Sequence, residues 1–319
     1  MIRITAKEAA EKLLKQDNIF VLMHRSPDGD TIGCGYALCM ALQQIGKKAR
    51  LLCADEIPQS YEYFTNSVEM QEFDAEYIVT VDVADRRLLG DLEMLYGDKV
   101  DLCIDHHGSN REFAEYGVIA ADAPACAQIM PEVIEGMGAK ITMQIADALF
   151  TGLTTDTGCF RYTGVTAQTH RTASYLIEKG ARSGMINRLM FETKPKRQVM
   201  LEKLAMESLQ YFCGEQVALI CITTEMMQKS GALDHDAESI PSIPRQIEGV
   251  KVAVTVKQKA DDYFRISLRT TDEIDASEIC RALGGGGHRA AAGCSYHGTL
   301  KDAVDTIVRL CSEAVENAV

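Results

Sequence analysis

Three features are scarce or missing in this sequence: long hydrophobic runs, paired cysteine motifs and an excess of positive charge. No apolar run reaches the roughly 18 to 20 residues that a membrane-spanning helix needs. The first residues include Lys7, Glu8, Glu11 and Lys12, and they form no hydrophobic segment of the kind found in signal peptides. We therefore expect a soluble, cytoplasmic protein with no membrane partner.

The eleven cysteines show no C-x-x-C pair, the spacing that indicates a structural zinc site or a redox couple. Cys39 and Cys221, for example, lie inside apolar stretches. That setting is typical of reduced cysteines packed in a hydrophobic core.

The chain carries 33 Lys and Arg residues against 46 Asp and Glu residues, a formal net charge of −13. A protein that binds long duplex nucleic acid mainly by releasing counterions needs a basic surface, so the charge argues against that class. A short oligonucleotide or a small nucleotide fits better. Such a ligand needs only a local cationic cleft, and metal ions can supply part of the positive charge of that cleft.

Size and composition predict two domains, because 319 residues with 46% hydrophobic content exceed the needs of one small core. The first part of the chain alternates short apolar runs with helical spacing, which predicts an α/β fold with a doubly wound, mainly parallel sheet. The expected strands are 19–23, 50–53, 77–81 and 100–104, and the expected helices are 29–45, 126–137 and 142–153.

The second part of the chain has a different pattern. A helical stretch at 183–212, with a charged and proline-containing middle, indicates a connection between domains. Strands are then expected at 217–223, 250–259 and 263–270, the last two joined as a hairpin. We therefore predict an N-terminal domain at 1–185, a helical linker at 186–213 and a smaller α/β domain at 214–319.

Acidic and imidazole side chains follow three of the expected strands of the first domain. His24, Asp28 and Asp30 follow the first strand, Asp82 follows the strand 77–81, and the triplet Asp105, His106 and His107 follows the strand 100–104. Ligands of open parallel sheets bind outside the carboxyl ends of the strands, so these side chains should share one rim. Asp156, at the end of the helix 142–153, should reach the same rim.

This set of residues predicts a site for two metal ions. Carboxylates and imidazoles are suitable ligands for manganese or magnesium. Two such ions about 3.5 to 4 Å apart can activate water and stabilise the leaving oxygen of a phosphoryl displacement. The sequence therefore predicts hydrolysis of phosphate esters.

A glycine run, Gly284 to Gly287, precedes His288 and separates helical patterns at 276–283 and 300–315. Glycines let backbone N–H groups approach a phosphate, and a helix start after the run would favour anions. The run lacks the Gly-Lys-Ser/Thr ending of a Walker loop. The alternative interpretation is a flexible hinge.

The order of these motifs resembles the DHH phosphoesterase family, named for the triplet seen here as Asp105, His106 and His107, with its C-terminal DHH-associated domain. The resemblance implies that His24, Asp28 and Asp82 hold one metal ion, with Asp156 as a further candidate. It implies that Asp30, Asp82, His106 and Asp156 hold the other, with Asp82 bridging. His107 and Asp82 would be catalytic, with His107 facing the scissile phosphate, and Asp105 would orient an imidazole.

The resemblance also implies substrate contacts. Arg269 and His288 would bind the phosphate or the nucleotide, together with the backbone of Gly285, Gly286 and Gly287. Asn110, which follows the triplet, is a further candidate for a phosphate contact, although such loop residues often only cap backbone groups.

Within the family, the chain looks most like the nanoRNase/pAp phosphatase group, which shortens very short oligonucleotides and dephosphorylates 3′-phosphoadenosine 5′-phosphate. The expected cofactor is a pair of divalent ions, manganese first and magnesium second. Three alternatives remain: a cyclic or linear di-adenosine nucleotide phosphodiesterase, a family II type inorganic pyrophosphatase and a module that binds nucleotides without hydrolysis. A homodimer is a further expectation, from the Met-rich second half of the first domain.

Overall fold

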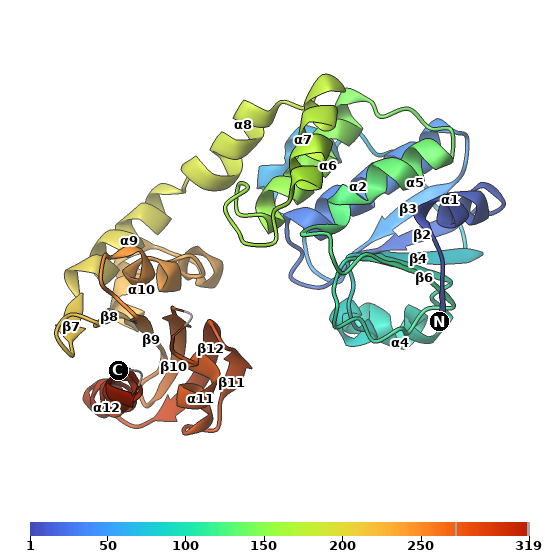
Figure 1. Cartoon of the computed structure of the whole chain (residues 1–319). Helices are drawn as coiled ribbons and strands as arrows, with labels where there is room; N and C mark the ends of the chain where they lie inside the picture. The colour runs from blue at the N-terminus through green and yellow to red at the C-terminus, as the bar shows by residue number, and fades with distance from the viewer. Residues whose placement is uncertain (272, 318–319) are drawn as a thin grey trace. The chain divides into compact units, whose positions relative to one another are not determined.

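The computed structural model describes residues 1–271 and 273–317. The chain divides into two compact units, Met1–Thr193 and Lys194–Val319. The boundary falls inside the segment 186–213 that the sequence assigns to a linker. Each unit contains one six-stranded sheet and a hydrophobic core of its own. Figure 1 labels the strands and helices of both units.

The sheet of the first unit is parallel throughout its described pairs. Its strand order is β1-β6-β5-β4-β2-β3. This arrangement confirms the predicted α/β fold. The strands are β1 (Ile2–Arg3), β2 (Ile19–Leu22), β3 (Ala49–Leu52), β4 (Tyr77–Val81), β5 (Leu102–Asp105) and β6 (Tyr116–Ile119).

Both faces of this sheet are covered, which is why its central strands are continuous apolar runs. Ile19 and Val21 of β2 face a core built with helices, whereas Phe20 and Leu22 face a second core. The first core packs against α1 (Ala6–Leu14), α2 (Gly29–Gln44), α5 (Met130–Gly136) and α6 (Met143–Asp156). The second core packs against the 3₁₀ segment Arg86–Leu92 and α4 (Glu93–Tyr96).

The remaining helices of the first unit are short or peripheral: α3 (Glu62–Thr65), α7 (Ala167–Glu178) and α8 (Ser183–Asn187). The predicted helix 126–137 is two pieces, a 3₁₀ turn at Cys126–Gln128 followed by α5. Pro131 lies in the first turn of α5, where its missing N–H costs no helical hydrogen bond. The long helical pattern at 183–212 is also broken, because Pro195 starts a new helix and residues 210–212 form a strand.

The second unit contains a mixed sheet in the order β11-β12-β10-β9-β8-β7. Only β8 and β9 pair in parallel among its described strands, and β9 and β10 form the predicted hairpin. Its elements are α9 (Lys196–Glu207), β7 (Gln210–Phe212), β8 (Val217–Ile222), α10 (Thr224–Ser230), β9 (Val252–Ala260), β10 (Tyr263–Thr270), α11 (Ala276–Arg281), β11 (Gly286–His288), β12 (Ala291–His297) and α12 (Leu300–Asn317).

The glycine run differs from its prediction. No helix starts directly after it: Gly286–His288 is the edge strand β11, which pairs antiparallel with β12, and α12 begins only at Leu300. The helix-start argument for anion binding at this place is therefore wrong. Gly285 and Gly287 have a packing role, because a Cβ on either would lie 2.3 Å from the carbonyl oxygen of Gly293 or 2.6 Å from that of Ala291, respectively.

Among the described residues, we find no helix with the length and hydrophobicity needed to cross a membrane.

Candidate metal centre

The centre lies where the order of the first sheet reverses. The chain leaves β2 through α2 to reach β3 on one side, then returns to β4 on the other side of β2. Such a switch point opens a crevice at the carboxyl ends of the strands. His24 follows β2, Asp82 follows β4, and Asp105 is the last residue of the neighbouring β5.

Close packing of two helices brings the remaining carboxylates to this crevice. Gly29 and Gly33 of α2 lie against α6 so tightly that a Cβ would be 2.3 Å from Oγ1 of Thr155 or from the carbonyl oxygen of Ala148, respectively. The start of α2 thus lies beside the end of α6. Asp30 therefore lies close to Asp156, the last residue of α6, and both belong to one group of candidate ligands.

Local hydrogen bonds fix the two loops that carry the ligands. Oδ1 of Asp28 caps α2, accepting from the N–H groups of Asp30 and Thr31 at 3.0 and 3.2 Å. The hydroxyl of Thr31 donates to the carbonyl oxygen of Val81 at 3.0 Å, which ties α2 to the end of β4. The backbone of Asp82 has φ +58, a left-handed conformation that aspartate tolerates better than most residues.

The structure brings the six predicted metal ligands into linked groups. His24, Asp28 and Asp82 form one group, Asp30, His106 and Asp156 form another, and a third contains Asp82, His106 and His107. Within each group the candidate ligand atoms lie within 4.8 Å of one another. Asp82 belongs to two of these groups.

Distances show how closely the imidazoles and the carboxylates approach. Nε2 of His24 lies 3.6 Å from Oδ1 of Asp28 and 3.8 Å from Oδ2 of Asp82. Nε2 of His106 lies 3.4 Å from Oδ1 of Asp82, 3.3 Å from Oδ2 of Asp156 and 4.0 Å from Oδ2 of Asp30. The other ring nitrogen of His106 contacts the carbonyl oxygen of Ala123 at 3.0 Å, which sets the orientation of the ring.

Asp30 is fully buried, and backbone groups hold it. The N–H groups of Cys126 and Ala127 donate to its two oxygens at 2.5 and 2.9 Å. Burial raises the pKa of Asp30 well above its usual range, and the carboxylates of Asp82 and Asp156 raise it further. Burial also raises the pKa of Asp82.

The pKa values of His24 and His106 are raised, although burial by itself would lower them. Burial lowers the pKa of His24, but its hydrogen bond and ion pair with Asp28 outweigh that effect and raise the pKa to about 9. Burial likewise opposes the charge on His106, yet Asp156 and Asp82 raise its pKa well above the usual range. Carboxylates crowded this closely favour a positive charge among them.

Two buried atoms at the centre have no hydrogen-bond partner among the described residues: Oδ1 of Asp82 and Nε2 of His106. They approach each other to 3.4 Å without hydrogen-bond geometry. An unpaired buried polar atom is costly, so the arrangement suits a ligand that both atoms can share. The donor set of carboxylate oxygens and imidazole nitrogens fits manganese or magnesium.

Asp105 is outside the three groups of candidate ligands and contacts His107 and Asn110. Its Oδ1 contacts Nδ1 of His107 at 2.8 Å, the kind of contact expected of a residue that orients an imidazole. Its Oδ2 accepts from the side-chain amide of Asn110 at 2.7 Å. The same amide also donates to the carbonyl oxygen of Val83, so the predicted substrate contact of Asn110 would have to compete with these bonds.

Among the predicted substrate residues of the second unit, all but Gly285 lie on one sheet. Arg269 belongs to β10 and pairs across to Ala291 of β12, while Gly286, Gly287 and His288 form the exposed edge strand β11. Arg269 also lines a cavity of about 320 Å³.

That cavity is also lined by Arg265 of β10, which lies four residues before Arg269, and by two basic residues that the sequence patterns did not single out, Lys257 and Lys259 of β9. The period-two pattern of the strands could have found them, because Lys257 and Lys259 share a face. Both lysines form ion pairs with Asp234: the Nζ atoms of Lys257 and Lys259 each lie 2.8 Å from Oδ1 of Asp234. Their hydrogen bonds lower the pKa of Asp234 to about 2.

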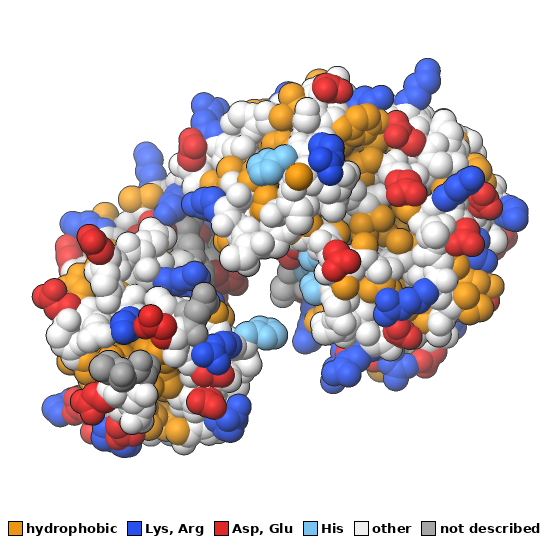
Figure 2. Space-filling view, viewed as in Figure 1, with side chains coloured by type: hydrophobic (Ala, Val, Ile, Leu, Met, Phe, Trp, Pro, Cys, Tyr) orange, Lys and Arg blue, Asp and Glu red, His pale blue; other side chains and the backbone are white. Residues whose placement is uncertain are grey.

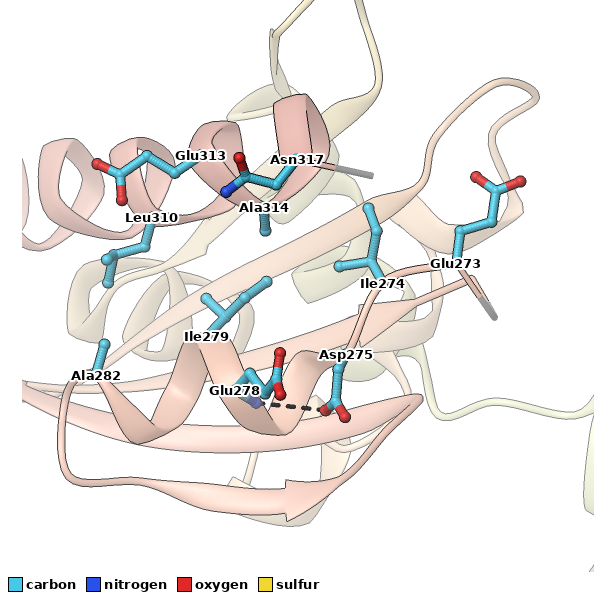
Figure 3. Close-up of a pocket in the computed structure, with 10 residues that line it drawn as sticks. All are labelled: Glu273, Ile274, Asp275, Glu278, Ile279, Ala282, Leu310, Glu313, Ala314 and Asn317. Atoms are coloured by element: carbon cyan, nitrogen blue, oxygen red, sulfur yellow. Dashed lines mark hydrogen bonds between the residues drawn. The ribbon is translucent and has the colours of Figure 1, made fainter. Parts of the chain in front are cut away.

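A different hollow, between α11 and α12, does not suit a phosphate. Its rim carries Glu273, Asp275, Glu278 and Glu313 (Figure 3). Over the face seen in Figure 2, basic and acidic side chains are interspersed, which agrees with the absence of a strongly basic surface expected from the net charge.

Comparisons with known proteins match both units. The domain described as "DHH family, N-terminal domain" matches residues 18–153, and the "DHHA1 domain" matches residues 218–317. A curated relative, the bifunctional oligoribonuclease and PAP phosphatase NrnA of Thermus thermophilus, is 28% identical over 307 residues, covering 94% of this chain and 91% of the relative.

A second relative is the cyclic-di-AMP phosphodiesterase GdpP of Bacillus subtilis. It is 24% identical over 99% of this chain but only 51% of its own length. Among solved structures, an exopolyphosphatase-related protein from Bacteroides fragilis superposes with a TM-score of 0.87 at 21% identity, covering 98% of this chain and 97% of that one. This likeness shows that the fold is shared along the whole chain.

The strand-end carboxylates, the Asp-His-His triplet and both domain matches agree with the resemblance seen in the sequence. The chain therefore belongs to the DHH phosphoesterase family of enzymes, with a DHH domain in its first unit and a DHHA1 domain in its second.

Proposed function

We propose that this enzyme hydrolyses short oligoribonucleotides to mononucleotides and 3′-phosphoadenosine 5′-phosphate to AMP, with two divalent ions, manganese or magnesium. The observation that carries the proposal is the carboxylate of Asp82, which two of the three ligand groups share. The similarity to the NrnA relative over nearly the full length of both chains supports the substrate class.

The residues that would hold the ions are His24, Asp28, Asp30, Asp82, His106 and Asp156. Bound there, divalent ions supply positive charge to the phosphoryl oxygens and lower the pKa of water. The protein supplies the fixed geometry. Asp30 is anchored by two backbone N–H groups, and the ring of His106 is oriented by the carbonyl oxygen of Ala123.

His107 would contact the scissile phosphate. Its Nδ1 is hydrogen-bonded to Oδ1 of Asp105, a contact that raises the pKa of His107. A protonated ring holds one proton at Nδ1, toward Asp105, and leaves Nε2 to donate to a phosphoryl oxygen. Asp105 thereby acts as a positioning residue.

In the second unit, Arg269 and His288 would bind the nucleotide, with the backbone of Gly285, Gly286 and Gly287. The exposure of β11 and the basic cavity around Arg269 support this assignment. The alternative function, cleavage of cyclic or linear di-adenosine nucleotides, is supported by the GdpP relative.

The test compares initial rates on three substrates, with manganese and then with magnesium: a 5′-labelled RNA dinucleotide, 3′-phosphoadenosine 5′-phosphate and cyclic di-AMP. We expect the first two to be hydrolysed faster than the third. No product from any of them, with a folded protein and either metal, would overturn the proposal. Binding without product formation would instead indicate a nucleotide-binding module.

A pair of variants isolates the metal centre. Asp82→Asn should abolish turnover and the rise in melting temperature that manganese produces. Asp91→Asn, at an exposed position outside the ligand groups, is the matched control and should behave as the unmodified protein does. Normal activity in Asp82→Asn would contradict the bridging role.

A further inference from the structure

A second basic cavity lies in the first unit, and its walls come from the loops that carry the metal ligands. It measures about 410 Å³ and is lined by Arg25, Asp85, Arg87, Leu88, Ser109 and Arg111, with Ala84. Arg25 adjoins His24, and Ser109 is two residues from His107. Two residues of chain span at most about 7 Å, so part of the cavity's lining comes from residues that lie next to His24 and His107 along the chain.

Backbone hydrogen bonds hold these loops together. The N–H of Arg25 donates to the carbonyl oxygen of Leu88 at 2.7 Å, and the N–H of Arg111 donates to the carbonyl oxygen of Ala84 at 2.8 Å. These bonds join the loop after β2 and the loop after β5 to the loop after β4. The three arginines therefore start from fixed backbone positions.

The cavity has a positive charge balance. Its lining includes three arginines and one acidic residue, Asp85, whose two carboxylate oxygens both lie 3.0 Å from Nε of Arg87. Arg25 and Arg111 form no ion pair with any carboxylate in the part of the chain that the structure describes. Two guanidinium groups are thus available to a ligand.

The lining also indicates the kind of ligand. Guanidinium forks match the oxygens of a phosphate, and the hydroxyl of Ser109 adds a donor. None of the described lining residues is aromatic, so the cavity offers no surface for stacking a base. A phosphate is therefore favoured over a nucleobase.

We propose that this cavity binds a second phosphate of the substrate while the scissile phosphate lies at the metal centre. The inference rests on the proposed function and adds a specificity to it. The enzyme prefers nucleotides with at least two phosphate groups, whatever their base, and the first unit itself contributes to that preference through Arg25 and Arg111.

The experiment compares 3′-phosphoadenosine 5′-phosphate with 3′-AMP, which lacks only the second phosphate. The readout is the ratio of the two kcat/KM values in the unmodified protein and in the double variant Arg25→Gln, Arg111→Gln. Two hydrogen bonds to a charged group predict a ratio of roughly 10² to 10⁴ in the unmodified protein, falling toward 1 in the double variant. An unchanged ratio would overturn the inference.

Arg86→Gln is the matched control, because Arg86 precedes Arg87 but pairs with Glu93 and Asp98 and does not line the cavity. It should leave the ratio unchanged. Melting curves check that each variant folds.

A binding measurement separates this inference from the proposed function. Calorimetry with 3′-phosphoadenosine 5′-phosphate, in chelator and without added metal, should give weaker binding in the double variant than in the unmodified protein or Arg86→Gln. If the unmodified protein hydrolyses neither substrate, the proposed function fails, and this measurement still decides whether the cavity binds a phosphate. Equal affinity in all three proteins would reject it.

Discussion

Gly152 of α6 lies directly against Asp30 of α2: a Cβ on residue 152 would come within 2.5 Å of Oδ1 of Asp30. The same Cβ would also lie 2.9 Å from the Cβ of Ala127, whose N–H donates to Asp30. The absence of one methyl group thus lets the buried carboxylate of Asp30 occupy its place at the candidate metal centre.

We predict that Gly152→Ala displaces Asp30 and weakens manganese binding. Alanine normally stabilises a helix interior by about 0.5–1 kcal/mol relative to glycine, but overpacking costs about 1–3 kcal/mol. The variant should therefore melt at a lower temperature and need more manganese for half-maximal activity. Gly184→Ala in α8, where a Cβ meets nothing within 4 Å, is the control. Equal metal affinity in both variants would contradict the role of Gly152.

Asp105→Asn should lower activity about 10- to 100-fold, the usual cost of losing a residue that orients a ligand. The amide keeps the shape but weakens the charge-assisted contact with Nδ1 of His107. The pKa of His107, followed by NMR, should fall toward its ordinary value because that contact is the main cause of its rise. A loss of activity with no change in this pKa would indicate a merely structural role.

Metal affinity should rise with pH between about 6.5 and 9. In the metal-free protein, the pKa of His24 is raised to about 9, so the protonated imidazole stabilises the fold. This stabilisation is complete below about pH 6.5 and is lost as the pH rises through about 9. A metal ion needs the neutral imidazole, so binding must release this proton at neutral pH. Manganese titrations at several pH values, in buffers of different ionisation enthalpy, measure both effects.

The control for this experiment is His235→Gln, at an exposed histidine outside the ligand groups. It should keep the pH dependence of the unmodified protein. A metal affinity that is flat between pH 6.5 and 9 would show that His24 does not compete with protons for the metal.

Asp234→Asn should tighten anion binding in the cavity around Arg269. Asp234 pairs with Lys257 and Lys259, and because its carboxylate is exposed we expect each ion pair to be worth only about 0.2–1 kcal/mol. KM should therefore fall by less than about fivefold per ion pair, with kcat unchanged. The carboxylate keeps its charge until the pH approaches about 2, so the difference between the proteins should persist across neutral pH. A higher KM would instead mean that Asp234 positions the lysines.

The sequence by itself determined the local features of this protein. Apolar runs predicted β2, β4 and β5, and the polar residues that follow these runs supply most of the candidate ligands, because strand and candidate ligand are neighbours in the chain. The resemblance to the DHH family, carried by the same motifs, gave the family that the comparisons confirm.

The tertiary structure decided what depends on distant segments. Strand pairing made the glycine run an edge strand, since Gly286 and His288 find their partners in β12 rather than in a helix. Sheet order brought Arg25, Arg87 and Arg111 from three loops to one cavity, and the approach of α2 and α6 set the position of Asp30. These contacts depend on pairing and packing between elements far apart in the sequence, which local patterns do not encode.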